Sequence, residues 1–114
     1  GHLLEICRGS KVGATLRFDD IPLIPDVKAW AERGVATGAS GRNWAGYGKD
    51  VQLPAGFAEW KQKLVTDPQT SGGLLVACAP DMVERVLAEF RKDGFAEARR
   101  IGEMSAGPAQ VTVV

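Results

Sequence analysis

The most restrictive feature of this sequence is a polar, glycine-rich turn followed by an apolar run. Asp67-Pro68 ends the element before it, because the proline ring pushes its neighbour out of the helical region. Thr70-Ser71-Gly72-Gly73 then supplies hydroxyls, free backbone N–H groups and two residues that tolerate positive φ. Residues 74–79, Leu-Leu-Val-Ala-Cys-Ala, predict a strand buried on both faces. Such a turn lets backbone approach an anion or another domain, although a tight turn alone needs the same residues.

Composition is that of an ordinary globular protein. The chain has 114 residues, enough for one domain at most, and 45% of them are hydrophobic and 25% charged. Fourteen basic and fourteen acidic residues cancel, and no lysine- or arginine-rich run stands out. We therefore expect no nucleic acid and no membrane among its partners. No apolar stretch approaches the roughly 20 residues that span a bilayer.

Two cysteines and the chain ends bear on its setting. Cys7 lies in a helical pattern and Cys78 in the apolar run, and both are predicted to be small core residues. No signal-peptide pattern opens the sequence, so a reduced, cytoplasmic setting is expected, with a disulfide left open. The chain starts without methionine inside a helical pattern and ends inside a strand pattern, which indicates a piece of a longer protein.

Hydrophobic spacing divides the chain into short helices and strands. Helices are predicted over residues 2–8, 26–33, 57–64 and 81–92, the last opened by a capping pair of Asp81 and Glu84. Strands are predicted over residues 12–18, 74–79, 97–104 and 109–114. Residues 35–55 contain four glycines that interrupt any period, so a long loop is predicted there. The order predicts an α+β fold, a mixed β-sheet covered by helices.

Catalytic and metal sites find little support in the residues alone. The chain has one histidine, His2, and its two cysteines are far apart, so no metal-ligand spacing recurs. A nucleophile pair of His2 with a cysteine is weakened because an apolar strand around Cys78 would disfavour its thiolate. We therefore assign no catalytic residue and no metal ligand within the chain.

Two glycine-containing segments could hold an anion. Residues 38–43 combine two glycines and a hydroxyl with Arg42 and Asn43, but they lack the Gly-Lys-Ser/Thr ending of a P-loop. Residues 70–73 precede an expected strand rather than a helix, so no helix dipole is expected there. Backbone N–H groups could form an anion-binding nest in either segment. The alternative in both cases is a turn that simply requires glycine. Asp67 is interpreted as a helix-end cap, and the alternative is that it orients neighbouring groups.

The stretch Leu64-Val65-Thr66-Asp67-Pro68-Gln69-Thr70-Ser71-Gly72-Gly73-Leu74-Leu75 closely resembles the signature of the selenophosphate synthetase (selenide, water dikinase) family. Three further pieces resemble the family in the same order. They are Gly1-His2-Leu3-Leu4-Glu5, Ile21-Pro22-Leu23-Ile24-Pro25, and the glycine-rich segment from Gly34-Val35 through Arg42-Asn43 to Tyr47-Gly48. The resemblance covers residues 1 to about 80, and the remainder agrees in element order.

The resemblance implies the C-terminal domain of a two-domain enzyme of the aminoimidazole ribonucleotide synthetase-like superfamily. That family makes selenophosphate from selenide, ATP and water, giving AMP and phosphate with Mg²⁺, for selenocysteine and selenouridine synthesis. The resemblance further implies that the partners are the chain's own N-terminal domain, selenide and ATP, and that the intact enzyme is a homodimer. The family's reactive cysteine or selenocysteine, its lysine and its metal-binding aspartates match no position here. Residues 1–114 are therefore expected to be inactive alone, with no cofactor of their own.

The resemblance also ranks the candidate site residues. Thr70, Ser71, Gly72 and Gly73 are the first candidates for facing the interdomain cleft and contacting ATP, with Arg42 and Asn43 second. The sequence Thr37-Gly38-Ala39-Ser40-Gly41 departs from the Gly-Gly-Thr expected before Arg-Asn, which weakens the case for the second segment.

Two alternatives stay open. The chain could be the C-terminal domain of another ATP-dependent member of the superfamily, such as a purine-biosynthetic synthetase, a hydrogenase-maturation enzyme or thiamine-phosphate kinase. It could instead be a non-catalytic interaction or regulatory domain that kept the fold.

Overall fold

A computed structural model describes residues 1–114 and confirms an α+β fold. Its helices are α1 (His2–Ser10), α2 (Val27–Glu32), α3 (Gly38–Tyr47), α4 (Glu59–Val65) and α5 (Val83–Lys92). Its strands are β1 (Gly13–Leu16), β2 (Val51–Gln52), β3 (Gly102–Ser105) and β4 (Val111–Val113). Three short 3₁₀ turns are η1 (Phe18–Asp20), η2 (Gly48–Asp50) and η3 (Pro80–Met82).

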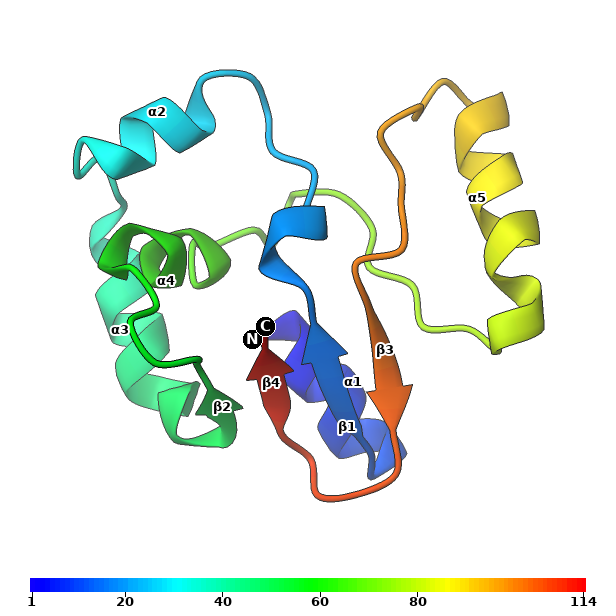
Figure 1. The fold of residues 1–114 in the computed structure, drawn as a ribbon, viewed down its shortest axis with the longest axis horizontal. Coiled ribbons are helices and arrows are strands. Elements are labelled where there is room, and N and C mark those ends of the chain that lie inside the picture. The colour runs from blue at the N-terminus through cyan, green and yellow to red at the C-terminus, as the bar shows by residue number, and fades with distance from the viewer.

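The four strands form one mixed sheet in the order β2-β4-β1-β3 (Figure 1). β1 pairs antiparallel with β3, placing Ala14 opposite Met104, and parallel with β4. β2 pairs parallel with β4 at one edge, and β3 forms the other edge. The short hairpin-like connection from β3 to β4 spans β1, so the first strand in sequence becomes a central one.

The core lies between α1 and the sheet. Leu4 and Cys7 are three residues apart and therefore share one face of α1, where both are buried. They pack against Ala14 of β1 and against Val111 and Val113 of β4, which point to the same face of the sheet. Alternate residues of β4 are buried, whereas β1 buries the consecutive residues Gly13 and Ala14, and the strand is shorter than the predicted residues 12–18.

An aromatic cluster joins α4 to the end of β1. The ring of Phe18 meets Phe57 and Trp60 edge-on, with centroids 5.5 and 5.8 Å away. The Lys61 ammonium lies 4.5 Å from the Phe18 ring centroid and also contacts Asp19. Cation–π attraction and aromatic packing therefore hold α4, whose helical pattern the sequence predicted, against the core.

The prediction of a long loop over residues 35–55 is wrong. This segment contains α3, followed by η2 and β2. Each glycine in a helix costs about 1 kcal/mol relative to alanine, which is why the glycines indicated a loop. Hydrogen bonds from Ser40 and Asn43 to the neighbouring helix offset that cost.

The prediction of a buried strand over residues 74–79 is also wrong. These residues are irregular and solvent-exposed, with Leu74 81% and Val76 49% exposed. Cys78 is exposed as well, whereas Cys7 is buried, so only one cysteine is a core residue. An apolar run predicts burial, but a strand also needs a paired neighbour, and residues 74–79 have none in this structure.

Smaller differences concern element ends. α1 runs through Gly9 to Ser10 and ends at Lys11, which adopts a left-handed conformation with φ of 56°. Residues 97–101 are not part of β3. The expected capping pair of Asp81 and Glu84 makes no side-chain bond, because η3 precedes α5 and places Met82 at its N-cap.

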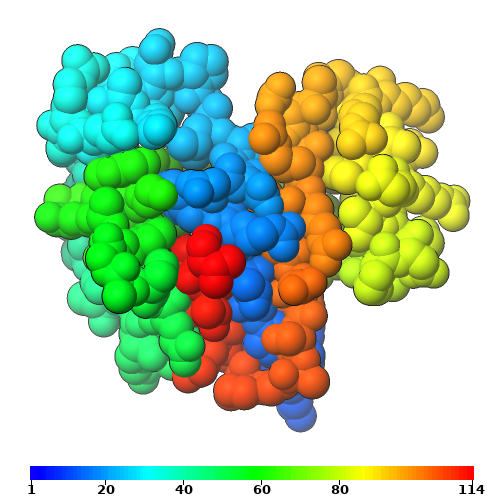
Figure 2. All heavy atoms as spheres, in the orientation of Figure 1, coloured from blue at the N-terminus to red at the C-terminus, as the bar shows by residue number.

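α5 lies at the side of the molecule next to β3 (Figure 1). None of its residues is buried, although its apolar residues all face the same way. In the space-filling view α5 and the segments joining it to β3 form a projection beside the sheet (Figure 2). The helix predicted over residues 81–92 is confirmed, but its apolar face is only partly covered.

Candidate functional site

The turn after α4 is built around the carboxylate of Asp67. The Thr37 hydroxyl donates to Asp67 Oδ1 at 3.0 Å, and Gln69 Nε2 donates to Asp67 Oδ2 at 2.6 Å. Both carboxylate oxygens therefore orient neighbours, one across the fold and one within the turn. Asp67 thus ties residues 67–69 to the start of α3 instead of serving only as a helix-end cap.

Residues 70–73 extend from this anchor into solvent. The Gly72 N–H donates to the Gln69 carbonyl at 2.9 Å, which closes a tight turn. The N–H groups of Thr70, Ser71 and Gly73 and the two hydroxyls make no hydrogen bond. This turn therefore presents several free donors on one short exposed segment.

Glycine at position 72 is favoured by close approach of Gln69 rather than by its backbone angle. Neither Gly72 nor Gly73 has a positive φ, so the reason for glycine expected from the sequence does not apply. A Cβ at Gly72 would lie 3.0 Å from the Gln69 carbonyl oxygen. A side chain at this position would require Gln69 to shift by a few tenths of an ångström, in the turn that displays the free donors.

A set of hydrogen bonds between α3 and the end of α4, which we call the α3–α4 latch, supports the turn from behind. Ser40 Oγ donates to the Lys63 carbonyl at 3.0 Å, and Ser40 is almost fully buried. Asn43 Nδ2 donates to the Thr66 carbonyl at 2.8 Å. The latch ends one residue before Asp67, so α3 determines where the turn begins.

The second pair of candidate residues is split by this arrangement. The Asn43 side-chain amide donates to the Thr66 carbonyl as part of the latch, so the Asn43 side chain lies behind the turn. Arg42, its neighbour, is exposed and its guanidinium makes no hydrogen bond or ion pair. The structure thus links residues 37–43 to residues 66–69 through side chains, while contact of either segment with a ligand stays a prediction.

Shifted pKa values lie outside the turn. Burial raises the pKa of the Cys7 thiol and that of the Tyr47 hydroxyl. A hydrogen bond from Lys63 lowers the pKa of the exposed Glu59 carboxyl. These groups belong to the core and to helix surfaces, so they indicate no acid–base catalyst.

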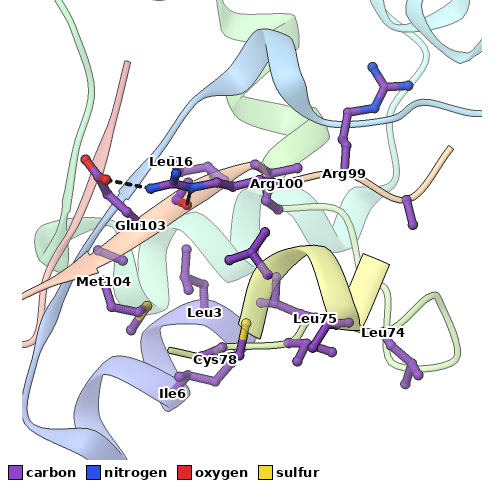
Figure 3. A pocket seen from close by; sticks show the side chains of 18 of the residues that line it. Leu3, Ile6, Leu16, Leu74, Leu75, Cys78, Arg99, Arg100, Glu103 and Met104 are labelled. Carbon is purple, nitrogen blue, oxygen red and sulfur yellow. Dashed lines mark hydrogen bonds and ion pairs between the residues drawn. The ribbon is translucent and has the colours of Figure 1, made fainter. Parts of the chain in front are cut away.

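Beside the turn lies an open apolar groove that the sequence did not predict. It has a volume of about 570 Å³ and is lined mainly by α1, β3, α5 and residues 73–78. Figure 3 shows Ile6, Cys78 and Met104 approaching one another in it, with Leu74 at its outer end. Gly73 and Gln69 also line the groove, so it is continuous with the turn.

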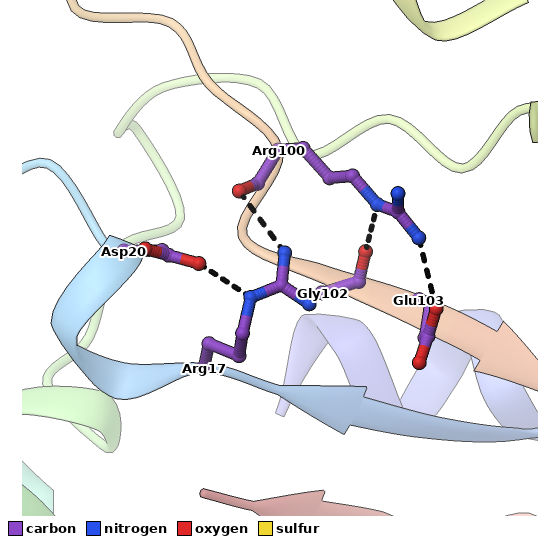
Figure 4. Close-up of polar contacts among 5 residues, drawn as sticks. All are labelled: Arg17, Asp20, Arg100, Gly102 and Glu103. Atoms are coloured by element: carbon purple, nitrogen blue, oxygen red, sulfur yellow. Dashed lines mark hydrogen bonds and ion pairs between the residues drawn. The ribbon is translucent and has the colours of Figure 1, made fainter.

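Arginines at the groove rim are already paired. Arg100 donates from Nε to the Gly102 carbonyl at 3.2 Å and from Nη2 to Glu103 at 2.8 Å (Figure 4). Arg17 donates to Asp20 and reaches the Arg100 carbonyl at 3.5 Å. Arg99 pairs with Glu97. Local carboxylates therefore neutralise these guanidinium groups, and the rim carries no free positive charge for an anion.

The structure places no three His, Cys, Asp or Glu side chains where they could share a metal ion. None of its helices has both the length and the apolar character needed to cross a membrane. The chemistry on display is thus hydrogen-bond donation from an exposed glycine-rich turn, supported by the latch.

Comparison with known proteins identifies the class to which this arrangement belongs. Residues 1–114 match the family described as AIR synthase related protein, C-terminal domain, and the chain belongs to that family. All 114 residues of the chain align with selenide, water dikinase of Paraburkholderia xenovorans at 57% identity, and they cover 32% of that relative. The chain is 47% identical to the enzyme of the same name from Dechloromonas aromatica, over 33% of that relative. The chain therefore spans about a third of the length of the curated relatives it matches.

Proposed function

We propose that residues 1–114 form the C-terminal domain of a selenide, water dikinase. The observation that carries this proposal is the match of the entire chain to relatives of that name at 47–57% identity. In this proposal the complete enzyme uses ATP, Mg²⁺, selenide and water to make selenophosphate for selenocysteine synthesis in the cytoplasm. The chain's partners are its own N-terminal domain and, in a homodimer, a second copy of the enzyme.

The residues present fit a phosphate better than a metal ion. The free N–H groups and hydroxyls of residues 70–73 are donors that a phosphate oxygen accepts. Mg²⁺ prefers carboxylate and water oxygens, and the nearby carboxylate, Asp67, is engaged by Thr37 and Gln69. In this proposal the metal is held by the remainder of the enzyme and not by residues 1–114.

The role proposed for this domain is to wall the ATP cleft. Phosphoryl transfer depends on positioning and on donors aimed at phosphate charge. Thr70, Ser71, Gly72 and Gly73 would donate hydrogen bonds to the nucleotide, while Asp67 and the latch hold the turn in place. Arg42, whose guanidinium is free, is the second candidate for a phosphate contact, and Asn43 would act behind it.

The test is made in the full-length enzyme by replacing Thr70 and Ser71 together with alanine. Formation of AMP is measured with selenide present, as a function of ATP concentration. We expect kcat/KM for ATP to fall about tenfold or more, since each lost hydrogen bond to a charged group contributes about 1.5–3 kcal/mol. The matched control is Ser10→Ala, which removes an exposed hydroxyl at the end of α1.

Unchanged kinetics of the Thr70→Ala/Ser71→Ala variant would exclude the proposed contact. A separate measurement tests the division of labour, because residues 1–114 alone should form no AMP. Selenide-dependent AMP formation by the isolated chain would contradict the assignment of all catalytic groups to the rest of the enzyme.

A further inference from the structure

One face of α3 makes contacts at both ends of the helix. Ser40, Asn43 and Tyr47 recur at intervals of three and four residues, so they lie on the same side of α3. The first two form the latch to the end of α4. Tyr47, the last residue of α3, packs instead against the core cluster between α1 and the sheet. A single helix face therefore contacts two parts of the chain that are far apart in sequence.

The Tyr47 ring lies directly beside Gly1. A Cβ atom at Gly1 would stand 3.1 Å from Tyr47 Cε1 and 3.4 Å from Cζ, so a side chain there would require the ring to shift. The Tyr47 hydroxyl makes no hydrogen bond within the chain, so the contact is made by the ring. Gly1 is itself fixed at the start of α1, because its carbonyl accepts the Glu5 N–H at 3.0 Å.

A second contact joins α1 to the segment that follows α3. Arg8 Nη2 donates to Asp50 Oδ2 at 2.8 Å, and Asp50 belongs to η2, which follows α3 directly. Arg8 Nη1 also donates to Glu5 at 2.7 Å. These charged groups are partly exposed, so the ion pair alone contributes little to stability. Together with the Tyr47 ring, however, it holds α1 at two points, and the start of α1 is therefore tied to the end of α3.

The other end of α3 holds the glycine-rich turn. Thr37, which precedes α3, donates to Asp67, and the latch ends one residue before Asp67. The helix between these contacts and Tyr47 has 10 residues, and a helix of that length spans about 15 Å. Since a helix is a rigid element, α3 sets how far Gly1 lies from the turn of residues 70–73.

We propose that Tyr47 is a positioning residue for the reaction, and that its ring seats the chain where it enters this domain at Gly1. This inference rests on the proposed function, in which residues that precede Gly1 belong to the rest of the enzyme. Through α3, the ring places that entering segment at a set distance from Thr70 and Ser71. The turn that donates to ATP and the rest of the enzyme are then fixed relative to each other before the nucleotide binds. Such preorganisation matters because a misplacement of about 1 Å can cost about 100-fold in rate.

The kinetic test compares Tyr47→Ala with Tyr47→Phe in the full-length enzyme, with AMP formation followed against ATP concentration in the presence of selenide. We expect Tyr47→Ala to raise KM for ATP at least about fivefold, because donors of residues 70–73 no longer meet the nucleotide. Tyr47→Phe keeps the ring and should keep the parental KM. Loss of folded protein would lower kcat and leave KM unchanged, so a raised KM separates positioning from stability. An unchanged KM in Tyr47→Ala would overturn the proposal.

A substitution at Gly1 tests the contact itself. Gly1→Ala places a methyl group against the ring, and we expect it to raise KM for ATP. In the Gly1→Ala/Tyr47→Ala variant the ring is gone, so this variant should be no worse than Tyr47→Ala alone. Residues in contact give such non-additive effects, whereas independent residues give additive ones, and additive effects here contradict the proposal. The control is Phe95→Ala, which removes an exposed ring next to α5 and should leave KM unchanged.

Amide hydrogen exchange gives a readout that does not depend on the reaction. In the full-length enzyme it is measured by mass spectrometry in the peptide that runs from the residues before Gly1 to Ile6. We expect Tyr47→Ala to accelerate exchange there at least about tenfold, since loss of a restraining contact favours local opening, and Tyr47→Phe to leave it unchanged. Equal exchange in the parent and in Tyr47→Ala would overturn the proposal. A parent enzyme that forms no AMP with selenide would contradict the proposed function, while the exchange result would still decide whether Tyr47 holds the entering chain.

Discussion

At the residue scale, the two cysteines show how the same type of side chain can be buried or exposed depending on its surroundings. Cys7 is 0% exposed in the centre of the core, beside Leu4 and Val113. Cys78 lies exposed at the groove. The sequence predicted that both are core residues, because each sits in an apolar local pattern. Burial depends on which elements cover that pattern, and α1 is covered by the sheet whereas residues 74–79 are not.

Burial of Cys7 predicts a loss of stability at alkaline pH. The pKa of its thiol is raised in the folded chain, so folding disfavours the thiolate. The contribution to stability is complete below the unfolded thiol pKa of about 8.5 and decreases as pH rises through the folded pKa. We expect the free energy of unfolding, measured with urea between pH 7 and 10, to show this decrease. In the Cys7→Ala variant the part of the decrease that begins near the thiol pKa should be absent.

Cys78→Ala is the matched control and should keep the decrease, because Cys78 is exposed. Tyr47, whose pKa is also raised by burial, adds a further loss at higher pH. A Cys7→Ala variant with the same pH dependence as the parent chain would contradict the assignment to Cys7.

At the element scale, α3 forms although its glycines argue against a helix. Local propensity alone predicts a loop, and the prediction failed because tertiary hydrogen bonds decide the outcome. Ser40 and Asn43 reach carbonyls at the end of α4, and Thr37 reaches Asp67. These partners are separated from α3 by more than twenty residues in sequence, so no local pattern could reveal them.

The latch predicts different effects for two neighbouring substitutions. Asn43→Ala leaves the Thr66 carbonyl without its donor, and we expect a loss of about 1–2 kcal/mol in the free energy of unfolding. Arg42→Ala removes an exposed side chain without partners, so we expect a change within about 0.5 kcal/mol. Denaturant unfolding of both variants measures the difference, and equal values would show that the latch contributes nothing to stability.

At the scale of the whole molecule, the core is small and lies at one place. Only 10 of 114 residues are buried, and the largest fully buried side chains are those of Leu4 and Val113. The apolar residues Val83, Val86, Leu87 and Phe90 of α5 line the open groove together with residues 74–78. Stability therefore depends on the contact between α1 and the sheet.

A core substitution should accordingly affect the entire fold. Leu4→Ala leaves a cavity between α1 and the sheet, and we expect a loss of about 2–5 kcal/mol in the free energy of unfolding. The adjacent Leu3→Ala is the control, because Leu3 is only partly buried and lines the groove. Thermal unfolding followed by circular dichroism compares the two, and a smaller loss for Leu4→Ala than for Leu3→Ala would place the main core elsewhere.

The sequence by itself determined the family, the α+β class and the elements whose apolar residues recur with a regular period. The string from Leu64 to Leu75 carries the family resemblance, and the local hydrophobic patterns over residues 2–8 and 12–18 predict the helix and the strand that became α1 and β1. Only the tertiary structure decided that α3 is a helix, that Asn43 lies behind the turn and that residues 74–79 face a groove. Those outcomes depend on which distant carbonyls and strand edges lie within reach, and the order of side chains along the chain does not contain that information.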